Sequence, residues 1–150
     1  MKPHCQSTKD LSLSRFSGVK LTEKRRQVLE IVTDATQPLS AYDIAGVYQQ
    51  RHSTSIPVMS VYRMLNFLVT SGYVHKLESV NRYMACEHLT CEHEHQNVQF
   101  LICDQCQQVQ EVDIEEQAQR LLFNGVEQSG FQLNTRHLEL HGICQNCRET

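Results

Sequence analysis

The hydrophobic residues in the first part of the chain repeat with the period of a helix rather than that of a strand. Three groups show this spacing: Val28, Leu29 and Val32; Ile44, Val47 and Tyr48; and Val61, Leu65 and Leu68. A stripe of this kind marks the packed side of an amphipathic helix. We expect the first helix to begin at a Thr22 cap and to end near Ala35. The second is expected to begin at Ser40, with Asp43 as its capping-box partner.

The third predicted helix has two distinct faces and is followed by a hairpin. It is expected from about Pro57 to Ser71, because Gly72 is typical of the position just beyond a helix end. Opposite its apolar side lie Tyr62, Arg63 and Asn66. Two short segments of strand composition, 73–76 and 82–85, flank a turn and predict a hairpin. Three helices and a hairpin, in that order, are typical of a winged helix-turn-helix.

The second half of the chain consists of shorter segments. Residues 98–102 and 109–112 have strand character, 114–129 has a helical repeat, and 131–141 alternates as a third strand. We expect the buried side of this helix to consist of Ala118, Leu121, Leu122 and Val126. The pattern therefore predicts a small β-β-α-β unit.

Together these elements predict an α/β chain of the α+β kind with two domains. The winged helix-turn-helix domain is expected over residues 1–85, with 1–18 as a flexible or short helical arm. Residues 86–97 have almost no apolar side chains and are expected to form a hinge. The small α/β domain is expected over 98–150.

The charge of the chain is divided between these halves. The net charge is −3, but the residues up to Lys76 carry ten Lys/Arg against five Asp/Glu, whereas those from Leu77 onward carry four against twelve. The first half therefore has a charge of +5 and the second of −8. A basic half joined to an acidic half indicates that only the first faces a polyanion such as DNA.

Cysteine and histidine are concentrated in the second half. Six of the seven cysteines and five of the eight histidines lie from Cys86 onward. The sequence has no apolar run of the roughly 20 residues that cross a bilayer. It also has no apolar signal segment at its start, so we expect a cytoplasmic protein without membrane contact. In a reducing compartment cysteine and histidine residues are more often metal ligands or catalytic groups than parts of disulfides.

Two C-x-x-C pairs give the strongest chemical signal. They are Cys103-Asp104-Gln105-Cys106 and Cys144-Gln145-Asn146-Cys147. A two-residue spacing lets a tight turn direct both sulfurs to one ion, and Zn²⁺ prefers four ligands in a tetrahedron. A site of four thiolates has no open position, which predicts a structural zinc. The competing interpretations are a dithiol redox switch and buried cysteines without a ligand.

A second metal site is suggested by the remaining ligand-capable residues. These are His75, Cys86, His88, Cys91, His93, His95 and Glu111. His75 and Cys86 belong to the two arms of the predicted hairpin, His93 and His95 to the hinge, and Glu111 to a strand of the second domain. A site with one sulfur, two nitrogens and one oxygen suits tetrahedral zinc and would tie the domains together. Taken singly, His75 and Glu111 are also compatible with ordinary surface positions.

With these residues in view, the sequence resembles the ferric uptake regulator family, and within it the zinc uptake regulator branch, from about Lys20 to Cys147. The marks of the family are Leu21-Thr22-x-x-Arg25, Val61-Tyr62-Arg63 and the two C-x-x-C pairs. The marks of the branch are Ser40-Ala41-Tyr42-Asp43, Gly72 to Ser79, Tyr83-x-x-Cys86 and Ile102-Cys103-Asp104-x-Cys106.

The resemblance implies a homodimeric repressor of zinc-uptake genes, with zinc as corepressor and two or more ions per subunit. The second domain would be the dimerisation domain. Structural zinc would be held by Cys103, Cys106, Cys144 and Cys147. Regulatory zinc would be held by His75, Cys86, His95 and Glu111, with His93 as the alternative to His95. The roles of His88, Cys91, His137 and His141 stay open.

The same resemblance implies that palindromic double-stranded operator DNA is the partner. Tyr62 and Arg63 would contact bases, because arginine to guanine is the commonest specific contact and a tyrosine ring can pack on a thymine methyl group. Phosphates would be held by Lys20, Lys24, Arg25 and Arg26. Such contacts contribute affinity without sequence information.

Three other functions remain as alternatives. A peroxide- or thiol-responsive regulator would oxidise Cys86 or a C-x-x-C pair. An iron-responsive regulator of the same family is the nearest alternative, but the thiolate of Cys86 argues against iron. A zinc hydrolase would need an open metal position and a general base. No catalytic motif supports a hydrolase, so we expect neither an enzyme nor a small-molecule substrate.

Overall fold

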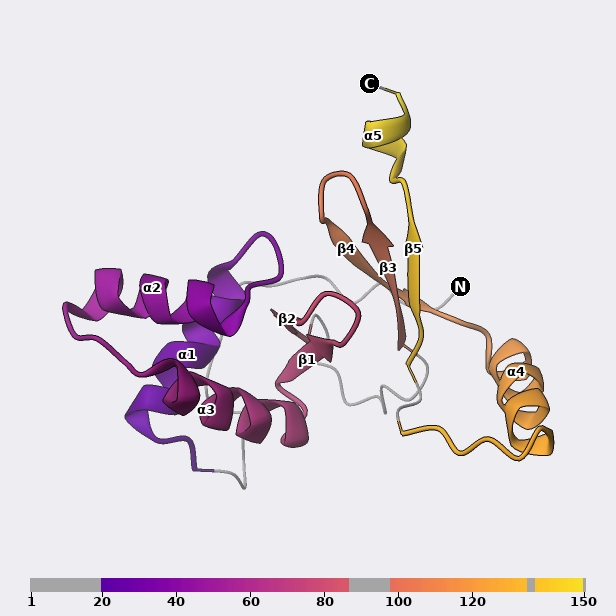
Figure 1. Cartoon of the computed structure of the whole chain (residues 1–150), viewed down its shortest axis with the longest axis horizontal. Coiled ribbons are helices and arrows are strands. Elements are labelled where there is room, and N and C mark those ends of the chain that lie inside the picture. The colour runs from indigo at the N-terminus through magenta and orange to yellow at the C-terminus, as the bar shows by residue number, and fades with distance from the viewer. Residues whose placement is uncertain (1–19, 87–97, 135–136, 150) are drawn as a thin grey trace. The chain divides into compact units, whose positions relative to one another are not determined.

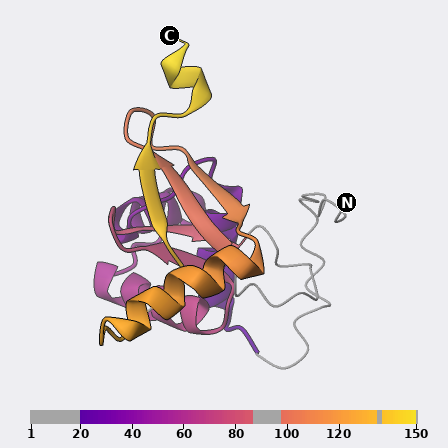
Figure 2. The ribbon, with the colours of Figure 1, turned by 90° about the vertical axis from the view of Figure 1, so that its right-hand side faces the viewer.

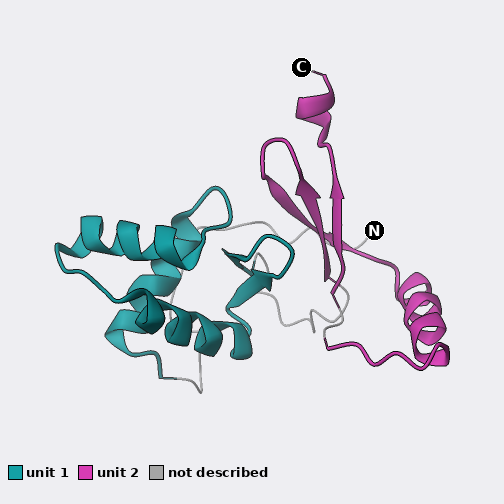
Figure 3. Cartoon of the chain, viewed as in Figure 1, with its two compact units in different colours: residues 1–92 teal, residues 93–150 magenta. Residues whose placement is uncertain are grey.

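Helices and β-sheets are combined in two compact units, Met1–Glu92 and His93–Thr150 (Figure 3). The structure is a computed structural model that describes residues 20–86, 98–134 and 137–149. This architecture confirms the mixed helix-and-sheet fold class. The predicted arm, 1–18, and all of the predicted hinge except Cys86 lie outside the described residues. None of the described helices has the length and apolar character needed to span a membrane.

In its described residues, unit 1 has three helices and a two-stranded wing (Figure 1). Its elements are α1 (Glu23–Asp34), α2 (Ala41–His52), α3 (Val58–Thr70), β1 (Val74–Leu77) and β2 (Arg82–Ala85). The helices begin at the predicted caps: the hydroxyl of Thr22 accepts from the Arg25 amide at 3.4 Å, and Ser40 and Asp43 form a complete capping box. Gly72 has a φ of +79°, a conformation that glycine adopts without steric cost, and the chain turns there from α3 into the wing. The predicted winged helix is therefore confirmed.

The core of unit 1 is formed by the apolar sides of the three helices and by residues of the wing. The helix side chains that are fully or almost fully buried include Val28, Leu29, Ile31, Val32, Ile44, Val61, Leu65 and Leu68. The wing contributes Val74 and Tyr83 to the same cluster. Burial of each aliphatic side chain stabilises the fold by roughly 1.5–3 kcal/mol. The same helical repeat that predicts the helices thus also builds their core.

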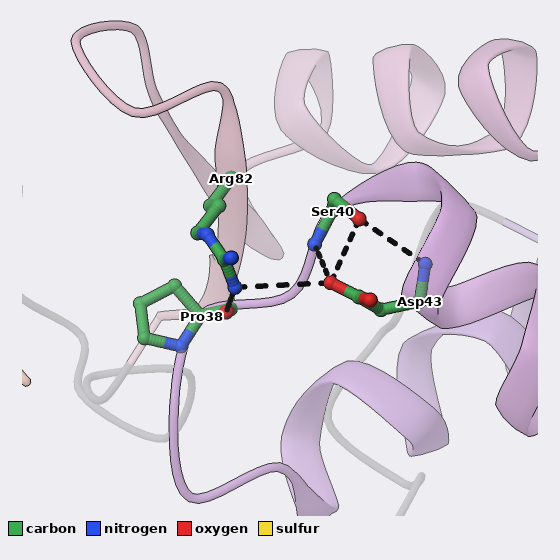
Figure 4. Close-up of polar contacts among 4 residues, drawn as sticks. All are labelled: Pro38, Ser40, Asp43 and Arg82. Carbon is green, nitrogen blue, oxygen red and sulfur yellow. Dashed lines mark hydrogen bonds and ion pairs between the residues drawn. The ribbon is translucent and has the colours of Figure 1, made fainter. Parts of the chain in front are cut away.

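The segment before α2 is joined to the wing by an isolated β-bridge. Leu39 and Tyr83 exchange two backbone hydrogen bonds, at 2.9 and 2.8 Å. Next to this bridge the guanidinium of Arg82 donates to the carbonyl of Pro38 at 3.0 Å and lies 3.7 Å from the carboxylate of Asp43 (Figure 4). The capping box of α2 is therefore also a link between that helix and the wing, which the sequence pattern did not reveal.

Unit 2 is a three-stranded sheet with two helices. Its elements are β3 (Val98–Cys103), β4 (Val109–Asp113), α4 (Glu116–Gln128), β5 (Glu139–Gly142) and α5 (Gln145–Arg148). The strand order is β4-β3-β5, with β4 antiparallel and β5 parallel to the central strand. The β-β-α-β order is as predicted, and the short helix α5 is an addition.

The last strand is much shorter than predicted. Residues 131–134 are not in a strand, and β5 begins only at Glu139. The physical reason is the parallel register, which pairs Glu139 with Phe100. At this offset the residues before His137 have no described residue of β3 opposite them. Alternation of apolar residues alone therefore overestimated the strand.

The predicted burial of α4 is wrong for the single chain. Ala118 is exposed, Leu121 and Leu122 are 70% and 45% exposed, and Val126 is only half-buried. Figure 1 shows α4 standing beside the sheet rather than lying over it. The helix is amphipathic as predicted, but no described element of its own chain covers its apolar side.

The capping box allows a direct test of the link between α2 and the wing. Hydrogen bonds from the hydroxyl and amide of Ser40, together with nearby Arg82, hold the pKa of Asp43 below its usual 3.8. We expect Asp43→Ala to lower the free energy of unfolding by about 1 kcal/mol at neutral pH. Because this pKa is depressed by folding, the contribution is present above about pH 4 and is lost as the pH falls through the folded-state value.

Urea unfolding across this pH range measures the effect. Glu30→Ala is the matched control, since Glu30 is also an exposed helix carboxylate but has no assigned partner among the described residues. Equal destabilisation by the two variants at neutral pH would contradict the proposed link.

Candidate metal sites and nucleic-acid interface

The two C-x-x-C pairs meet at one end of the sheet in unit 2. Cys103 is the last residue of β3, and the parallel register places it opposite Gly142, the last residue of β5. Both strands therefore end at the same edge of the sheet, and the cysteines lie at or just beyond these ends. At this edge a turn leads from Cys103 to Cys106, and α5 connects Cys144 to Cys147 (Figure 1). The four sulfurs all lie within 4.8 Å of one another. Figure 2 shows the same end of the sheet from the side.

The spacing of the sulfurs fits a tetrahedral zinc ion. A Zn–S bond of about 2.3 Å implies sulfur–sulfur separations of about 3.8 Å in a tetrahedron. The sulfurs of Cys106 and Cys144 lie 3.7 Å apart. All four ligands are cysteines, and such a closed set is typical of a structural site rather than a catalytic one.

The electrostatics of the cluster also favour a cation. The backbone amides of Cys106 and Cys144, the latter 3.4 Å from the sulfur, lower the pKa of Cys103 to about 6. By contrast, the thiol of Cys144 and the other neighbouring sulfurs raise the pKa of Cys147 to about 12. Four thiols this close cannot all ionise by themselves, because each new thiolate repels the others. A bound dication removes that conflict.

Asp104 and His141 hold the two cysteine turns together. The Asp104 amide donates to the carbonyl of Gly142 at 2.9 Å, and its carboxylate lies 2.7 Å from Nδ1 of His141. His141, whose role the sequence left open, therefore links β5 to the turn after β3. The position of Asp104 inside the first C-x-x-C pair was the only sequence signal for its part in this link.

The wing of unit 1 carries two further ligand groups. His75 on β1 and Cys86, which follows β2, offer a nitrogen and a sulfur within 4.8 Å of each other. The antiparallel register of the hairpin brings them together, and the Cys86 amide donates to the carbonyl of Tyr73 at 3.1 Å. Cys86 is 4% exposed, and Nε2 of His75 is buried. An imidazole and a thiol are two of the four ligands that a tetrahedral metal site would need.

The other candidates for this second site belong to other segments of the chain. Glu111 is a half-buried residue of β4 in unit 2. His88, Cys91, His93 and His95 lie outside the described residues. His137 contacts the ring of Phe100 edge-on and lies 3.5 Å from the carboxylate of Glu139, which supports a structural role in unit 2.

The predicted DNA-contacting residues of α3 differ in their surroundings. Arg63 is exposed, whereas Tyr62 is half-buried and packs against the hydrophobic core. The expectation that Tyr62 lies wholly on the outer face is therefore wrong, because the core of unit 1 is wide enough to include its flank. Of the arginines that the structure describes in unit 1, Arg63 alone has no assigned ion pair, hydrogen bond or ring contact.

The four basic residues expected at phosphates fall into two pairs. Lys20 and Lys24 are exposed. The guanidinium of Arg25 lies over the Phe67 ring, 3.7 Å from its centroid, and Arg26 forms an ion pair with Glu23 at 3.3 Å. The lysines are therefore more available to a polyanion than the arginines.

Comparisons with known proteins agree with this arrangement. The family model of the ferric uptake regulator family matches residues 16–141. The zinc uptake regulation protein of Escherichia coli (strain K12) is 35% identical over 132 residues, which are 88% of this chain and 75% of the relative. The peroxide operon regulator of Bacillus subtilis (strain 168) is 24% identical over 143 residues, which are 91% of this chain and 90% of the relative.

Two solved structures have the same fold. The zinc uptake regulator complexed with zinc and DNA has a TM-score of 0.74 at 33% identity, covering 89% of this chain and 86% of that chain. The crystal structure of holo XcZur has a TM-score of 0.70 at 34% identity, covering 89% of each chain. With its winged helix, its four-cysteine cluster and a family match over most of its length, the chain belongs to the ferric uptake regulator family.

Proposed function

We propose that this protein is a zinc-responsive transcriptional repressor that binds palindromic operators of zinc-uptake genes as a zinc-loaded homodimer. The observation that carries the proposal is the imidazole–thiol pair of His75 and Cys86, built into the wing of a DNA-binding fold. The similarity to a zinc uptake regulation protein supports the same conclusion. A ligand pair at this place couples metal binding to the element that contacts DNA.

Two kinds of zinc site are proposed, which gives two or more ions per subunit. The four cysteines of unit 2 hold a structural ion, since their spacing leaves no open position. His75, Cys86, Glu111 and a histidine of the segment 87–97 hold the regulatory ion. His95 is the preferred histidine, with His93 as the alternative. The thiolate of Cys86 favours zinc over ferrous iron at this site.

The DNA interface is proposed on α3 and the start of α1. The exposed guanidinium of Arg63 binds a guanine edge in the major groove, and the exposed edge of Tyr62 packs beside it. Lys20 and Lys24 bind phosphates, with Arg25 and Arg26 in support. Basic residues at phosphates position the protein, whereas α3 supplies the sequence preference.

Zinc can regulate DNA binding because the proposed ligands of the regulatory ion come from both units. Zinc supplies the charge that keeps the thiolate, imidazoles and carboxylate together. His75 and Cys86 fix the wing to Glu111 of unit 2, so the two copies of α3 in a dimer are held about one DNA turn apart, roughly 34 Å, or a multiple of it. Without this tie only a fraction of the dimers has the competent spacing, which lowers the apparent affinity for DNA.

The homodimer is proposed to form through α4 and the segments beside it. The large apolar residues that are exposed in the described part of unit 2 are Leu101, Leu121, Leu122, Phe131, Leu133, Leu140 and Ile143. Apolar side chains gathered on one small unit mark a protein–protein interface. We also place the protein in the cytoplasm, where thiols stay reduced and able to bind metal.

Oxidation sensing is the second candidate, because one observation favours it. A pKa of about 6 for Cys103 makes it a thiolate at neutral pH when no metal is bound, and thiolates react readily with oxidants. Mild peroxide treatment of the zinc-loaded protein distinguishes the two. A repressor that responds to zinc keeps its metal and DNA binding under conditions that release both from an oxidation sensor.

The structural zinc is tested by Cys103→Ser. We expect this variant to lose zinc and to melt at least 10 °C below the wild type, since removing one ligand opens the site that joins both cysteine turns. Metal analysis and thermal unfolding measure the two effects. Gln105→Ala, which changes an exposed side chain in the same turn, is the matched control and should keep its zinc. Unchanged zinc content in Cys103→Ser would contradict the structural site.

The regulatory site is tested by Cys86→Ser and Glu111→Gln. Each is expected to keep the zinc of the four-cysteine cluster and to weaken zinc-dependent DNA binding at least tenfold, since a ligand of the second ion is lost. Fluorescence anisotropy with an AT-rich palindromic duplex at buffered free zinc measures this. Glu127→Gln, at an exposed carboxylate of α4, is the control and should bind like the wild type. Wild-type behaviour of both ligand variants would overturn the assignment.

The dimer interface is tested by Leu121→Glu, which places a charge on the exposed apolar side of α4. We expect the variant to shift from dimer to monomer at micromolar concentration and to lose operator binding. Light scattering coupled to size-exclusion chromatography measures the mass. Gln117→Glu adds the same charge at an exposed polar position of the helix and should remain dimeric. A dimeric Leu121→Glu variant would place the interface elsewhere.

A further inference from the structure

The outer face of α3 presents a single stripe of exposed side chains. Its members are Met59, Arg63, Asn66 and Thr70, and every other residue of the helix is buried or half-buried. The spacings of four, three and four residues place them in one row along the helix. Arg63 is one of the four, so the stripe extends the proposed DNA-contacting surface by about one turn toward the start of the helix and about two turns toward its end.

From this stripe we propose that Asn66 is a second base-reading residue, which recognises an adenine within two base pairs of the guanine that Arg63 contacts. The inference rests on the proposed function, since it takes α3 to lie in the major groove. It adds a specific base preference that neither the metal sites nor Arg63 would provide.

The chemistry of the side chain fits this role. The Nδ2 group of an asparagine can donate to N7 of adenine while its Oδ1 accepts from the N6 amino group, so that one amide matches the N6 and N7 edge of adenine with two hydrogen bonds. In the part of the chain that the structure describes, no group is assigned to the amide of Asn66. Only its backbone carbonyl is engaged, by the hydroxyl of Thr70 at 2.8 Å. The amide is therefore free to bind a ligand.

The distance along the helix also fits neighbouring bases. Three residues separate Arg63 from Asn66, which corresponds to about 4.5 Å along an α-helix. Successive bases of a strand lie about 3.4 Å apart. Side chains of these lengths on one face of a groove-bound helix therefore reach adjacent base pairs or the next pair but one.

A purely structural role does not explain an asparagine at this position. The side chain is exposed and packs against none of the core cluster. Asparagine is also a poorer helix former than alanine in a helix interior. The fold of unit 1 thus gains nothing from this amide, whereas Arg25 and Arg82 stabilise the fold through Phe67 and Asp43.

The test is selection of binding sites from a pool of randomised duplexes by the zinc-loaded full chain. Wild type, Asn66→Ala and Asn66→Asp are compared, and Gln50→Ala is the control, because it removes an exposed amide from α2. We expect the wild type to prefer adenine by roughly 5- to 150-fold at one position of each half-site. This preference should vanish in both Asn66 variants, while the neighbouring guanine preference and the salt dependence of binding stay unchanged.

The outcomes separate the inference from the proposed function. A wild type that selects no sequence with zinc bound contradicts the proposed repressor itself. A selective wild type whose base preferences survive in Asn66→Ala overturns the inference alone. A uniform loss of affinity at every sequence would also overturn it by making Asn66 a phosphate contact. Thermal unfolding confirms that the exposed substitutions leave the fold intact.

Discussion

The parallel pairing of β3 with β5 is the constraint on which the metal chemistry of unit 2 depends. Cys106 and Cys144 are 38 residues apart in the sequence, yet their sulfurs are 3.7 Å apart, because two parallel strands end at the same edge of a sheet. The link between Asp104 and His141 fastens this edge. The proposed zinc ion and the strand pairing would therefore stabilise each other, as is general for sites that form only in the folded chain.

The charged side chains of unit 1 differ in whether they have partners within the domain. Most of its described arginines are used internally, on Glu23, Asp34, Asp43 or the ring of Phe67. Arg63 and Asn66 on the outer stripe of α3 are not. Exposed ion pairs contribute little to the stability of a small domain. The difference between side chains with and without partners is therefore more informative about function than about stability. It identifies α3 as the surface kept available for a ligand.

Local patterns in the sequence predicted the elements that depend on local interactions. The caps at Thr22 and Ser40, the helical repeat of α3 and the turn at Gly72 were all predictable, because each involves residues close in the chain. The short β5, the bridge of Leu39 to Tyr83 and the exposure of Leu121 were not. The length of β5 and the bridge depend on how strands pair, and the exposure of Leu121 depends on whether another surface covers the apolar side of α4. Neither can be predicted from residues that are close in the chain. For the sites, C-x-x-C spacing predicted the four cysteines as a set, whereas the half-burial of Tyr62 depends on the packing of the whole domain.

The central claim is that zinc binding at the regulatory site and operator binding are thermodynamically coupled. Coupling of this kind is reciprocal, so DNA must raise the affinity for zinc by the same factor as zinc raises the affinity for DNA. The most direct measurement is the zinc affinity of the wild-type dimer, by competition with a chelator of known affinity, with and without the operator duplex. We expect the operator duplex to raise the zinc affinity of the wild-type dimer at least fivefold and to leave that of Cys86→Ser unchanged. Equal zinc affinity in the presence and absence of DNA would contradict it.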